Sequence, residues 1–404
     1  MKVVLTTIVA CSTLLLGMRS AFTQTWSQTT APTNLWSAIA CSADGTKVIA
    51  ASGVSIFSSA PNGVIYISTN SGGSWMPTTA PAARWISVAS SANGSRLIAV
   101  ASQGPVYTSP DGGTTWVSNK VPNLTWKSVA SSADGSRLIA GATGNQLFIS
   151  TNSGVNWSSN TAPGNGLDGV QAVASSADGL MLAVGGRDIC ISTNGGQAWI
   201  TNVFSTSLFV GICSSADGTK LAAVNGNGGP AHIYTSRDSG ATWTMNTNAP
   251  ALNWLSIASS ADGTKLIASA WISSGIPHGP VYTSSDSGMT WTSNNLQQIT
   301  WMGVASSADG DTLFADGAVS SAQGQVWSSQ STPAPQLNIS AADTNVLLSW
   351  IVPSTNFTLE QNSDLSTADW MAVTNIPTLD YTNVQFEVAL PQTNSQSFYR
   401  LVNP

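Results

Sequence analysis

Ser284-Ser285-Asp286-Ser287-Gly288-Met289-Thr290-Trp291 is one copy of a short motif, Ser-x-Asp/Asn-x-Gly-x-x-Trp, around which the sequence is organised. In this motif the Asp or Asn can cap its own turn, the Gly permits a positive φ, and the Trp supplies a large apolar surface. We call the motif the Trp turn, and it predicts a tight turn held in place by an indole. Its six capping residues are Asn70, Asp111, Asn152, Asn194, Asp238 and Asp286.

A second motif, Ser-Ala-Asp/Asn-Gly, occurs seven times and precedes each Trp turn. Asp-Gly between two apolar runs indicates a β-hairpin. Successive hairpin motifs lie 39–49 residues apart, which is the length of a four-stranded propeller blade. The sequence therefore predicts an all-β protein with a seven-bladed β-propeller. The acidic or amide residues of the hairpins are Asp44, Asn93, Asp134, Asp178, Asp217, Asp262 and Asp309.

The seventh repeat lacks a Trp turn, and the missing strand is found at the other end of the chain. Thr25 to Pro32 (Thr-Trp-Ser-Gln-Thr-Thr-Ala-Pro) matches the fourth strand and crossover of the other blades. Pairing this segment with the last blade would cover two exposed sheet edges. We therefore expect a propeller over residues 24–331, then a linker at 332–336. Short alternating runs over 337–404 predict a small β-sandwich resembling a fibronectin type III module.

The amino terminus and the charge limit the location and the partners. Residues 1–23 hold Lys2, an apolar run and a small-residue end, which predicts a secretory signal peptide. Removing Lys2 and Arg19 leaves 11 basic and 19 acidic residues, a net charge of −8. Such a chain argues against nucleic acid partners. We expect a secreted or cell-surface monomer without a membrane span in the mature chain. A disulfide between Cys190 and Cys213 is left open, with buried thiols favoured.

Strand order separates two faces of the propeller. Hairpins and Trp turns share one face, here the hairpin face, and crossovers and the loops between second and third strands share the other, the loop face. Long loops are expected at Ser52 to Asn62, Trp271 to Gly279 and Ala315 to Gly324. Because long loops on a rigid scaffold often carry function, we expect the partner site on the loop face. Its primary candidates are Trp271, His278, Phe57 and Arg84.

A ring of aromatic residues is the secondary candidate. An aromatic residue stands eight positions before the hairpin Asp or Asn in six of the seven blades. Such a ring is either a stacking platform for sugars or packing between blades, and its repetition favours packing. The tryptophans of this ring are Trp36, Trp85, Trp126, Trp254 and Trp301.

The Trp turns resemble the Asp-box, or BNR, repeat shared by sialidases, certain endoglucanases and non-enzymatic propellers such as photosystem assembly factors. The resemblance covers roughly Gln24 to Gln330. In those families the repeat lies away from the active site, so the resemblance implies the fold and no particular activity. Sialidases are expected to add three arginines, a Tyr nucleophile with a Glu, and an acidic proton shuttle. Here Glu360 and Glu387 both lie after the propeller, and only Arg84 and Arg187 map to the loop face.

Other catalytic and metal sites are weakly supported. A glycosidase needs two facing carboxylates. The propeller aspartates outside the two turn motifs are Asp168, Asp188, Asp311 and Asp316. Asp311 follows a hairpin and is a poor candidate, and Asp316 is separated from Asp168 and Asp188 because blades four and seven are not neighbours. His232 and His278 with Asp316 form no ligand-spaced motif. We expect no catalytic residue, no metal and no cofactor, and therefore a binding or assembly module for an extracellular glycan or protein. The alternative is a glycoside hydrolase, sialidase-like or endoglucanase-like, with an unrecognised acidic pair.

Overall fold

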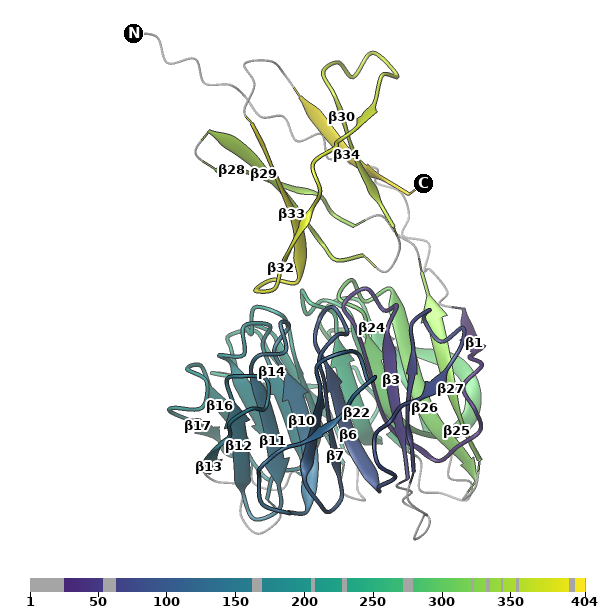
Figure 1. Ribbon diagram of the computed structural model, residues 1–404, viewed down its shortest axis with the longest axis vertical. Helices are drawn as coiled ribbons and strands as arrows, with labels where there is room; N and C mark the ends of the chain where they lie inside the picture. The colour runs from purple at the N-terminus through teal and green to yellow at the C-terminus, as the bar shows by residue number, and fades with distance from the viewer. Residues whose placement is uncertain are drawn as a thin grey trace.

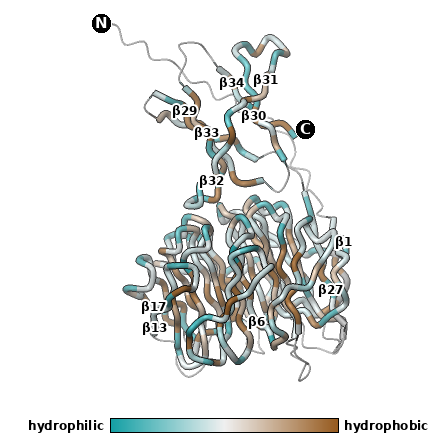
Figure 2. Tube along the Cα trace, viewed as in Figure 1, coloured by the Kyte–Doolittle hydropathy of each residue, from teal (hydrophilic) through white to brown (hydrophobic). Residues whose placement is uncertain are grey.

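The computed structural model describes residues 25–53, 63–161, 169–204, 208–226, 231–271, 279–320, 323–331, 335–342, 344–353, 356–391 and 397–403. Within these residues every regular element is a β-strand. No helix in the described ranges is long and apolar enough to cross a bilayer. Apolar strands run through the middle of the larger domain, and hydrophilic turns gather at its two faces (Figure 2). The all-β prediction is confirmed.

Five blades are separate four-stranded antiparallel sheets whose strands follow chain order. Their strands are β2 (Trp36–Cys41), β3 (Val48–Ser52), β4 (Ile65–Ser68) and β5 (Met76–Pro77); β6 (Trp85–Ser90), β7 (Leu97–Ala101), β8 (Val106–Ser109) and β9 (Val117–Ser118); β10 (Trp126–Ser131), β11 (Leu138–Ala142), β12 (Gln146–Ser150) and β13 (Ser158–Thr161); β14 (Ala172–Ser175), β15 (Leu182–Gly185), β16 (Ile189–Ser192) and β17 (Ile200–Asn202); β18 (Phe209–Ser214), β19 (Leu221–Asn225), β20 (Ile233–Ser236) and β21 (Thr244–Asn246). The first strand of each blade contacts the first strands of its two neighbours, so these strands surround the axis.

The sixth and seventh blades are joined in one sheet. Its strands are β22 (Asn253–Ser259), β23 (Leu266–Trp271), β24 (Gly279–Ser284), β25 (Thr292–Ser306), β26 (Thr312–Ser320), β27 (Gln323–Gln330) and β1 (Trp26–Gln28). Strand β25 pairs with β24 through its first part and with β26 through its last part. At the outer edge Trp26 lies opposite Ser329, which confirms that the amino-terminal segment completes the last blade.

One of the three long loops predicted from the sequence is wrong. The segment from Ala315 to Gly324 is not a long loop, because β26 and β27 continue pairing up to Ser320 and Gln323. The ladder therefore takes up most of this segment, and the connection is short. The other two expected long loops, at 52–62 and 271–279, fall mainly outside the described residues.

Seven backbone hydrogen bonds close a ring at the hairpin face. The Ala of each Ser-Ala-Asp/Asn-Gly motif donates its N–H to the carbonyl of the corresponding Ala in the next blade, at 2.7–2.8 Å. The last of them, Ala308, donates to the first, Ala43, so the cycle has one member for each hairpin. This agrees with the expected number of blades. We call these residues the alanine ring: Ala43, Ala92, Ala133, Ala177, Ala216, Ala261 and Ala308.

The Gly of each hairpin is required by conformation and by space. All seven hairpin glycines have φ between 66° and 73°, where a side chain is strained. A Cβ at Gly263 would also lie 2.8 Å from the Cβ of Lys220 in the preceding blade, whose ammonium group donates to the carbonyl of Asp262. The other six hairpin glycines meet an equivalent side chain of the preceding blade at 2.6–2.9 Å. The hairpin turn is therefore also a contact between blades.

Gly263→Ala is expected to lower the free energy of unfolding by about 2–4 kcal/mol, from about 1–2 kcal/mol of backbone strain plus the crowding against Lys220. Gly144→Ala is the matched control, because Gly144 has φ of 73° and an added Cβ would meet no atom within 4 Å. The control is expected to lose only the backbone part. Urea unfolding measures both, and equal losses would contradict the crowding.

The carboxy-terminal module consists of two small sheets with a shared apolar core. One sheet contains β28 (Asn338–Ala342), β29 (Asn345–Ile351), β33 (Gln385–Pro391) and β32 (Thr378–Asp380), and the other β31 (Met371–Ala372), β30 (Thr358–Asn362) and β34 (Phe398–Val402). Leu348, Trp350, Leu359, Val388 and Leu390 are buried between them. The β32–β33 end of the module lies against one face of the blades (Figure 1).

The cysteines of the described chain are separate thiols. Cys190 and Cys213 are buried thiols that are not bonded to each other, so the disulfide left open by the sequence is not formed. Burial raises the pKa of Cys190 to about 11 and that of Cys213 to about 12. Both groups are therefore neutral near pH 7 and act as small apolar side chains.

Candidate functional site

The Ser, Asp, Thr and Trp side chains of the Trp turn at Asp238 form hydrogen bonds within the turn. Ser236 Oγ donates to Asp238 Oδ1 at 2.8 Å, and Oδ1 also accepts the Thr242 N–H at 2.9 Å. Gly240 N donates to Ser236 Oγ at 2.9 Å, and the Trp243 indole donates to the Gly240 carbonyl at 3.2 Å. Hydrogen bonds from the Thr242 hydroxyl and N–H lower the pKa of Asp238 to about 2. This carboxylate stabilises a turn, as the sequence predicts.

The remaining turn acids have the same role. The other five Trp turns have the same bond from the N–H four residues on, at 2.8–2.9 Å, to Asn70, Asp111, Asn152, Asn194 and Asp286. Each hairpin Asp or Asn accepts the N–H two residues on, at 2.8–3.0 Å. All these Asp and Asn residues lie on the hairpin face. They are committed to turns and are poor candidates for catalysis.

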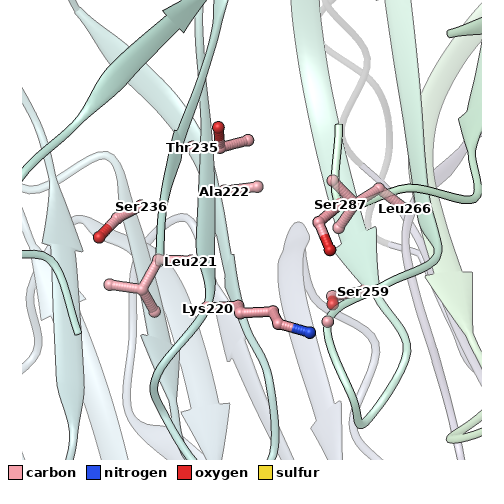
Figure 3. A pocket seen from close by; sticks show the side chains of 9 residues that line it. Lys220, Leu221, Ala222, Thr235, Ser236, Ser259, Leu266 and Ser287 are labelled. Carbon is pink, nitrogen blue, oxygen red and sulfur yellow. The ribbon is translucent and has the colours of Figure 1, made fainter. Parts of the chain in front are cut away.

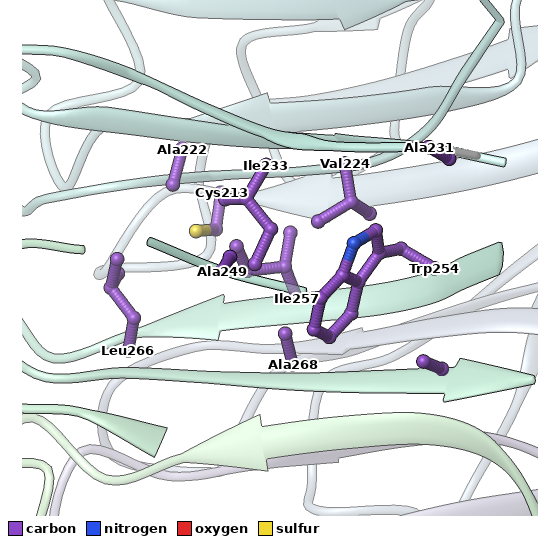
Figure 4. Close-up of a cluster of buried hydrophobic side chains, with 11 residues drawn as sticks. Cys213, Ala222, Val224, Ala231, Ile233, Ala249, Trp254, Ile257, Leu266 and Ala268 are labelled. Carbon is purple, nitrogen blue, oxygen red and sulfur yellow. The ribbon is translucent and has the colours of Figure 1, made fainter. Parts of the chain in front are cut away.

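The five tryptophans of the aromatic ring are core residues. Trp36 is 1% exposed and the other four are 0% exposed, so neither face of any indole is open to a ligand. Trp254 packs on Ile233, Val224 and Ala231 of the preceding blade (Figure 4). It also meets Tyr282 of its own blade edge-on, with ring centroids 5.6 Å apart. Burial corrects the stacking-platform candidate: Trp36, Trp85, Trp126, Trp254 and Trp301 join neighbouring blades.

The structure places the primary candidates far apart or leaves them undescribed. Trp271 ends β23 of blade six, half-buried and paired with Asn253. Arg84 is exposed directly before β6 of blade two, and its carbonyl accepts the Ser102 N–H at 2.7 Å. Blades seven and one lie between these two residues. Phe57 and His278 lie outside the described residues. The described members therefore do not form one cluster.

The acidic candidates of the loop face are buried where the structure describes them. Asp188 is 8% exposed and accepts the Phe204 N–H at 3.1 Å. Asp316 is 0% exposed inside β26, and burial raises its pKa to about 7. Asp168 lies outside the described residues. Among the described residues no three His, Cys, Asp or Glu side chains are grouped to hold a metal ion. His232 is half-buried, and its backbone N–H donates to Asn225 Oδ1.

The two cavities found between blades are small. The one at Lys220, Leu266 and Ser287, between blades five and six, holds about 10 Å³ (Figure 3). The other, at Lys47, Ser90 and Gly112 between blades one and two, holds about 20 Å³. A cavity of this size accommodates about one water molecule. Neither of these two cavities can hold a ligand larger than about one water molecule.

No family model matches the chain, and no characterised relative matches it in sequence. Solved structures do share its fold. YCF48 bound to a D1 peptide has a TM-score of 0.54 and 16% identity, covering 77% of this chain and 97% of that one. YCF48 from Cyanidioschyzon merolae has a TM-score of 0.56 and 16% identity, and the match covers 76% of this chain and 98% of that one. The GH74 xyloglucanase from Xanthomonas campestris has a TM-score of 0.57 and 13% identity, and the match covers 81% of this chain and 59% of that one. The fold is a β-propeller.

The two faces of the propeller differ in charge and in cover. The hairpin face carries the turn acids and, at its centre, the carboxy-terminal module. The loop face exposes Arg84, Lys120 and Arg187 and half-exposes Lys127, all in blades two to four or the crossover between them. Lys120 and Lys127 were not among the residues predicted from the sequence. Their positions would have placed them on the loop face, because Lys120 lies in the crossover before blade three and Lys127 near the start of its first strand. Where it is described, the loop face presents exposed positive and no exposed negative side chains.

Proposed function

We propose that this propeller is an exported, non-enzymatic binding or assembly module whose loop face carries the partner site. The contrast between the two faces carries the proposal. A partner cannot approach the centre of the hairpin face while the module covers it. The loop face is free of the module and exposes Arg84 of blade two, Lys120 of the crossover to blade three and Arg187 of blade four. Complementary charge favours an anionic partner, either an acidic protein segment or an acidic glycan.

The solved structures with this fold support a binding role in different degrees. One YCF48 structure holds a D1 peptide, so a propeller of this size can carry a peptide partner. The GH74 xyloglucanase keeps a glycoside hydrolase as the second candidate function. That chemistry needs two carboxylates facing one cleft. Asp188 and Asp316, the described acids nearest the loop face, are both buried, which favours the binding module.

Binding of anionic polymers tests the proposal. The full chain is expected to bind poly-L-glutamate or polygalacturonate in a salt-dependent manner and not poly-L-lysine. The double variant Arg84→Ala/Lys120→Ala should weaken this binding about 2-fold to 30-fold, because each exposed charge pair contributes about 0.2–1 kcal/mol. Arg237→Ala is the matched control, since Arg237 is an exposed arginine on the hairpin face. Calorimetric titration measures the affinities.

Three results would contradict the proposal. Binding of neither anion would remove the charged loop face as its basis. An equal loss in Arg237→Ala would show unspecific attraction to the chain as a whole. Turnover of sialosides or β-glucans by the same preparation would replace the binding module by the hydrolase.

A further inference from the structure

The alanine ring is covered by apolar residues of the carboxy-terminal module. Val352 and Val384 are 4% and 8% exposed and form one apolar cluster with ring members such as Ala43 and Ala308. Ile351, Leu379 and Phe386 pack around the same cluster. All seven alanines take part, so the contact is centred on the axis rather than on one blade. Methyl groups that would face solvent at the middle of the hairpin face are thereby buried.

Val384 reaches this contact from a strained backbone. Its φ is 55°, in the left-handed region that β-branched residues rarely adopt. The residue is the last one of the turn between β32 and β33, a position for which Gly or Asn is the unstrained choice. Its carbonyl accepts the Val352 N–H at 3.2 Å, which ties the two covering valines together. A strained Val at this site is explained by the apolar contact that only its side chain can make.

A polar contact fixes the angle at which the module sits. Seven equivalent alanines offer seven nearly equivalent orientations to an asymmetric partner. Asn93 is the one asparagine at the seven hairpin positions, and the other six are Asp. Asn93 Nδ2 donates to the Tyr381 hydroxyl at 3.3 Å. Its Oδ1 already accepts bonds from Ser91 and Ser95. In this contact the Asn93 amide is the donor and the Tyr381 hydroxyl is the acceptor, whereas an Asp at the same position could only accept from the hydroxyl.

We propose that the carboxy-terminal module is a plug for the propeller: Val352 and Val384 seal the alanine ring, and the Asn93–Tyr381 hydrogen bond sets the orientation. The propeller and module then act as one rigid body. The β32–β33 end of the module is unavailable for attachment to another surface, and a partner can reach the axis only from the loop face. This role does not depend on what the loop face binds.

Substitution of one covering residue in the full chain tests the plug. Val384→Asp places a charge in the apolar contact and is expected to speed amide hydrogen exchange at least about tenfold in residues 379–386, and to raise exchange in the hairpins beside the alanine ring. The radius of gyration from small-angle scattering should increase as the module separates. Ile376→Asp is the control, because it also replaces a β-branched apolar residue of the module by Asp, but at a position that is 87% exposed. Unchanged exchange in Val384→Asp, or an equal change in Ile376→Asp, would overturn the proposal.

Two milder variants decide the matter if Val384→Asp unfolds the module. Val384→Gly relieves the positive φ and removes only the covering side chain, so the module core around Trp350 should stay protected while residues 379–386 exchange faster. Tyr381→Phe removes only the hydroxyl that Asn93 contacts and should give a smaller increase in the same segment. If residues 379–386 of Val384→Gly exchange at the wild-type rate, Val384 does not seal the alanine ring. If they exchange at the wild-type rate in Tyr381→Phe, the Asn93–Tyr381 hydrogen bond does not set the orientation of the module.

Discussion

Trp85→Ala is expected to lower the free energy of unfolding by about 3–5 kcal/mol, the range for removal of a fully buried Trp. Trp85 is 0% exposed and meets Tyr107 edge-on at a centroid distance of 5.4 Å. It belongs to a cluster that includes Ile49 and Ile65 of blade one and Leu97 of its own blade. Its loss therefore leaves a cavity on the boundary between two blades. Urea unfolding followed by circular dichroism measures the change.

The same experiment separates packing from ligand binding. Trp271→Ala is the matched control, because Trp271 is half-buried at the loop-face end of its strand and should lose less stability. Anion binding by the folded fraction of Trp85→Ala should equal that of the wild type, since no face of the indole is accessible. Wild-type stability combined with lost binding would return Trp85 to the binding site and contradict the core assignment.

Local signals in the sequence are strong enough to predict most of the propeller. Each hairpin motif fixes a turn through Gly φ and an Asp or Asn cap, and each Trp turn fixes a second one. Because both recur at blade spacing, errors at one repeat are corrected by the others. The closing strand was predictable for the same reason: Trp26 and Ala31-Pro32 repeat a pattern seen in complete blades.

Contacts between distant residues carry the part that the sequence did not reveal. Ala43 and its six counterparts have an obvious place in the hairpin, but nothing in their pattern says that the carboxy-terminal module covers them. In the sequence Val384 begins a predicted strand and Val352 follows another, and neither stands out as a contact residue. Their contact with the ring depends on how the module is oriented, which no local propensity encodes.

The candidate site was predictable only to the level of a face. Strand order alone separates the loop face from the hairpin face, and the structure agrees with that division. The position of a side chain around the ring depends on its blade, so Trp271 and Arg84 could be placed on one face without being neighbours. For Asp316, spacing along the chain indicates its distance from the hairpin but not the side of the strand on which its carboxyl group lies. That side faces the interior.

Asp316→Val is expected to stabilise the protein and to remove part of its pH dependence. Asp316 lies opposite Gly303 in the ladder of β25 and β26, and its carboxyl group is buried with only the backbone N–H groups of Gly303 and Asp316 close enough to lower its pKa. Neither contact has the geometry of a full hydrogen bond, so burial dominates. The same pair in blade five is Gly211 and Val224. A Cβ on Gly303 would lie 2.3 Å from Asp316 Oδ1, and a Cβ on Gly211 would lie 2.9 Å from Val224 Cγ2. Valine thus fills this kind of site elsewhere in the chain.

The direction of the pH effect follows from burial. Burial raises the pKa of Asp316 from 3.8 to about 7, so the folded protein keeps this proton where the unfolded chain has lost it. Below about pH 4 both states are protonated and the group has no effect on folding. From about pH 4 to pH 7 the folded state is progressively destabilised, by on the order of 4 kcal/mol at the end of the range, at about 1.4 kcal/mol for each pH unit.

Unfolding of both proteins at pH 5 and pH 8 measures this difference. The advantage of Asp316→Val over the wild type should be about 2–3 kcal/mol larger at pH 8 than at pH 5, by the same linkage. Turn acids whose pKa is lowered, such as Asp262 and Asp286, lose their stabilising effect at acid pH and so act in the opposite direction. Both proteins contain them, so they cancel in the comparison. An equal advantage at the two pH values would show that the Asp316 carboxyl group is solvated or paired in the folded protein, and the buried seam between blades seven and one would then have to admit water.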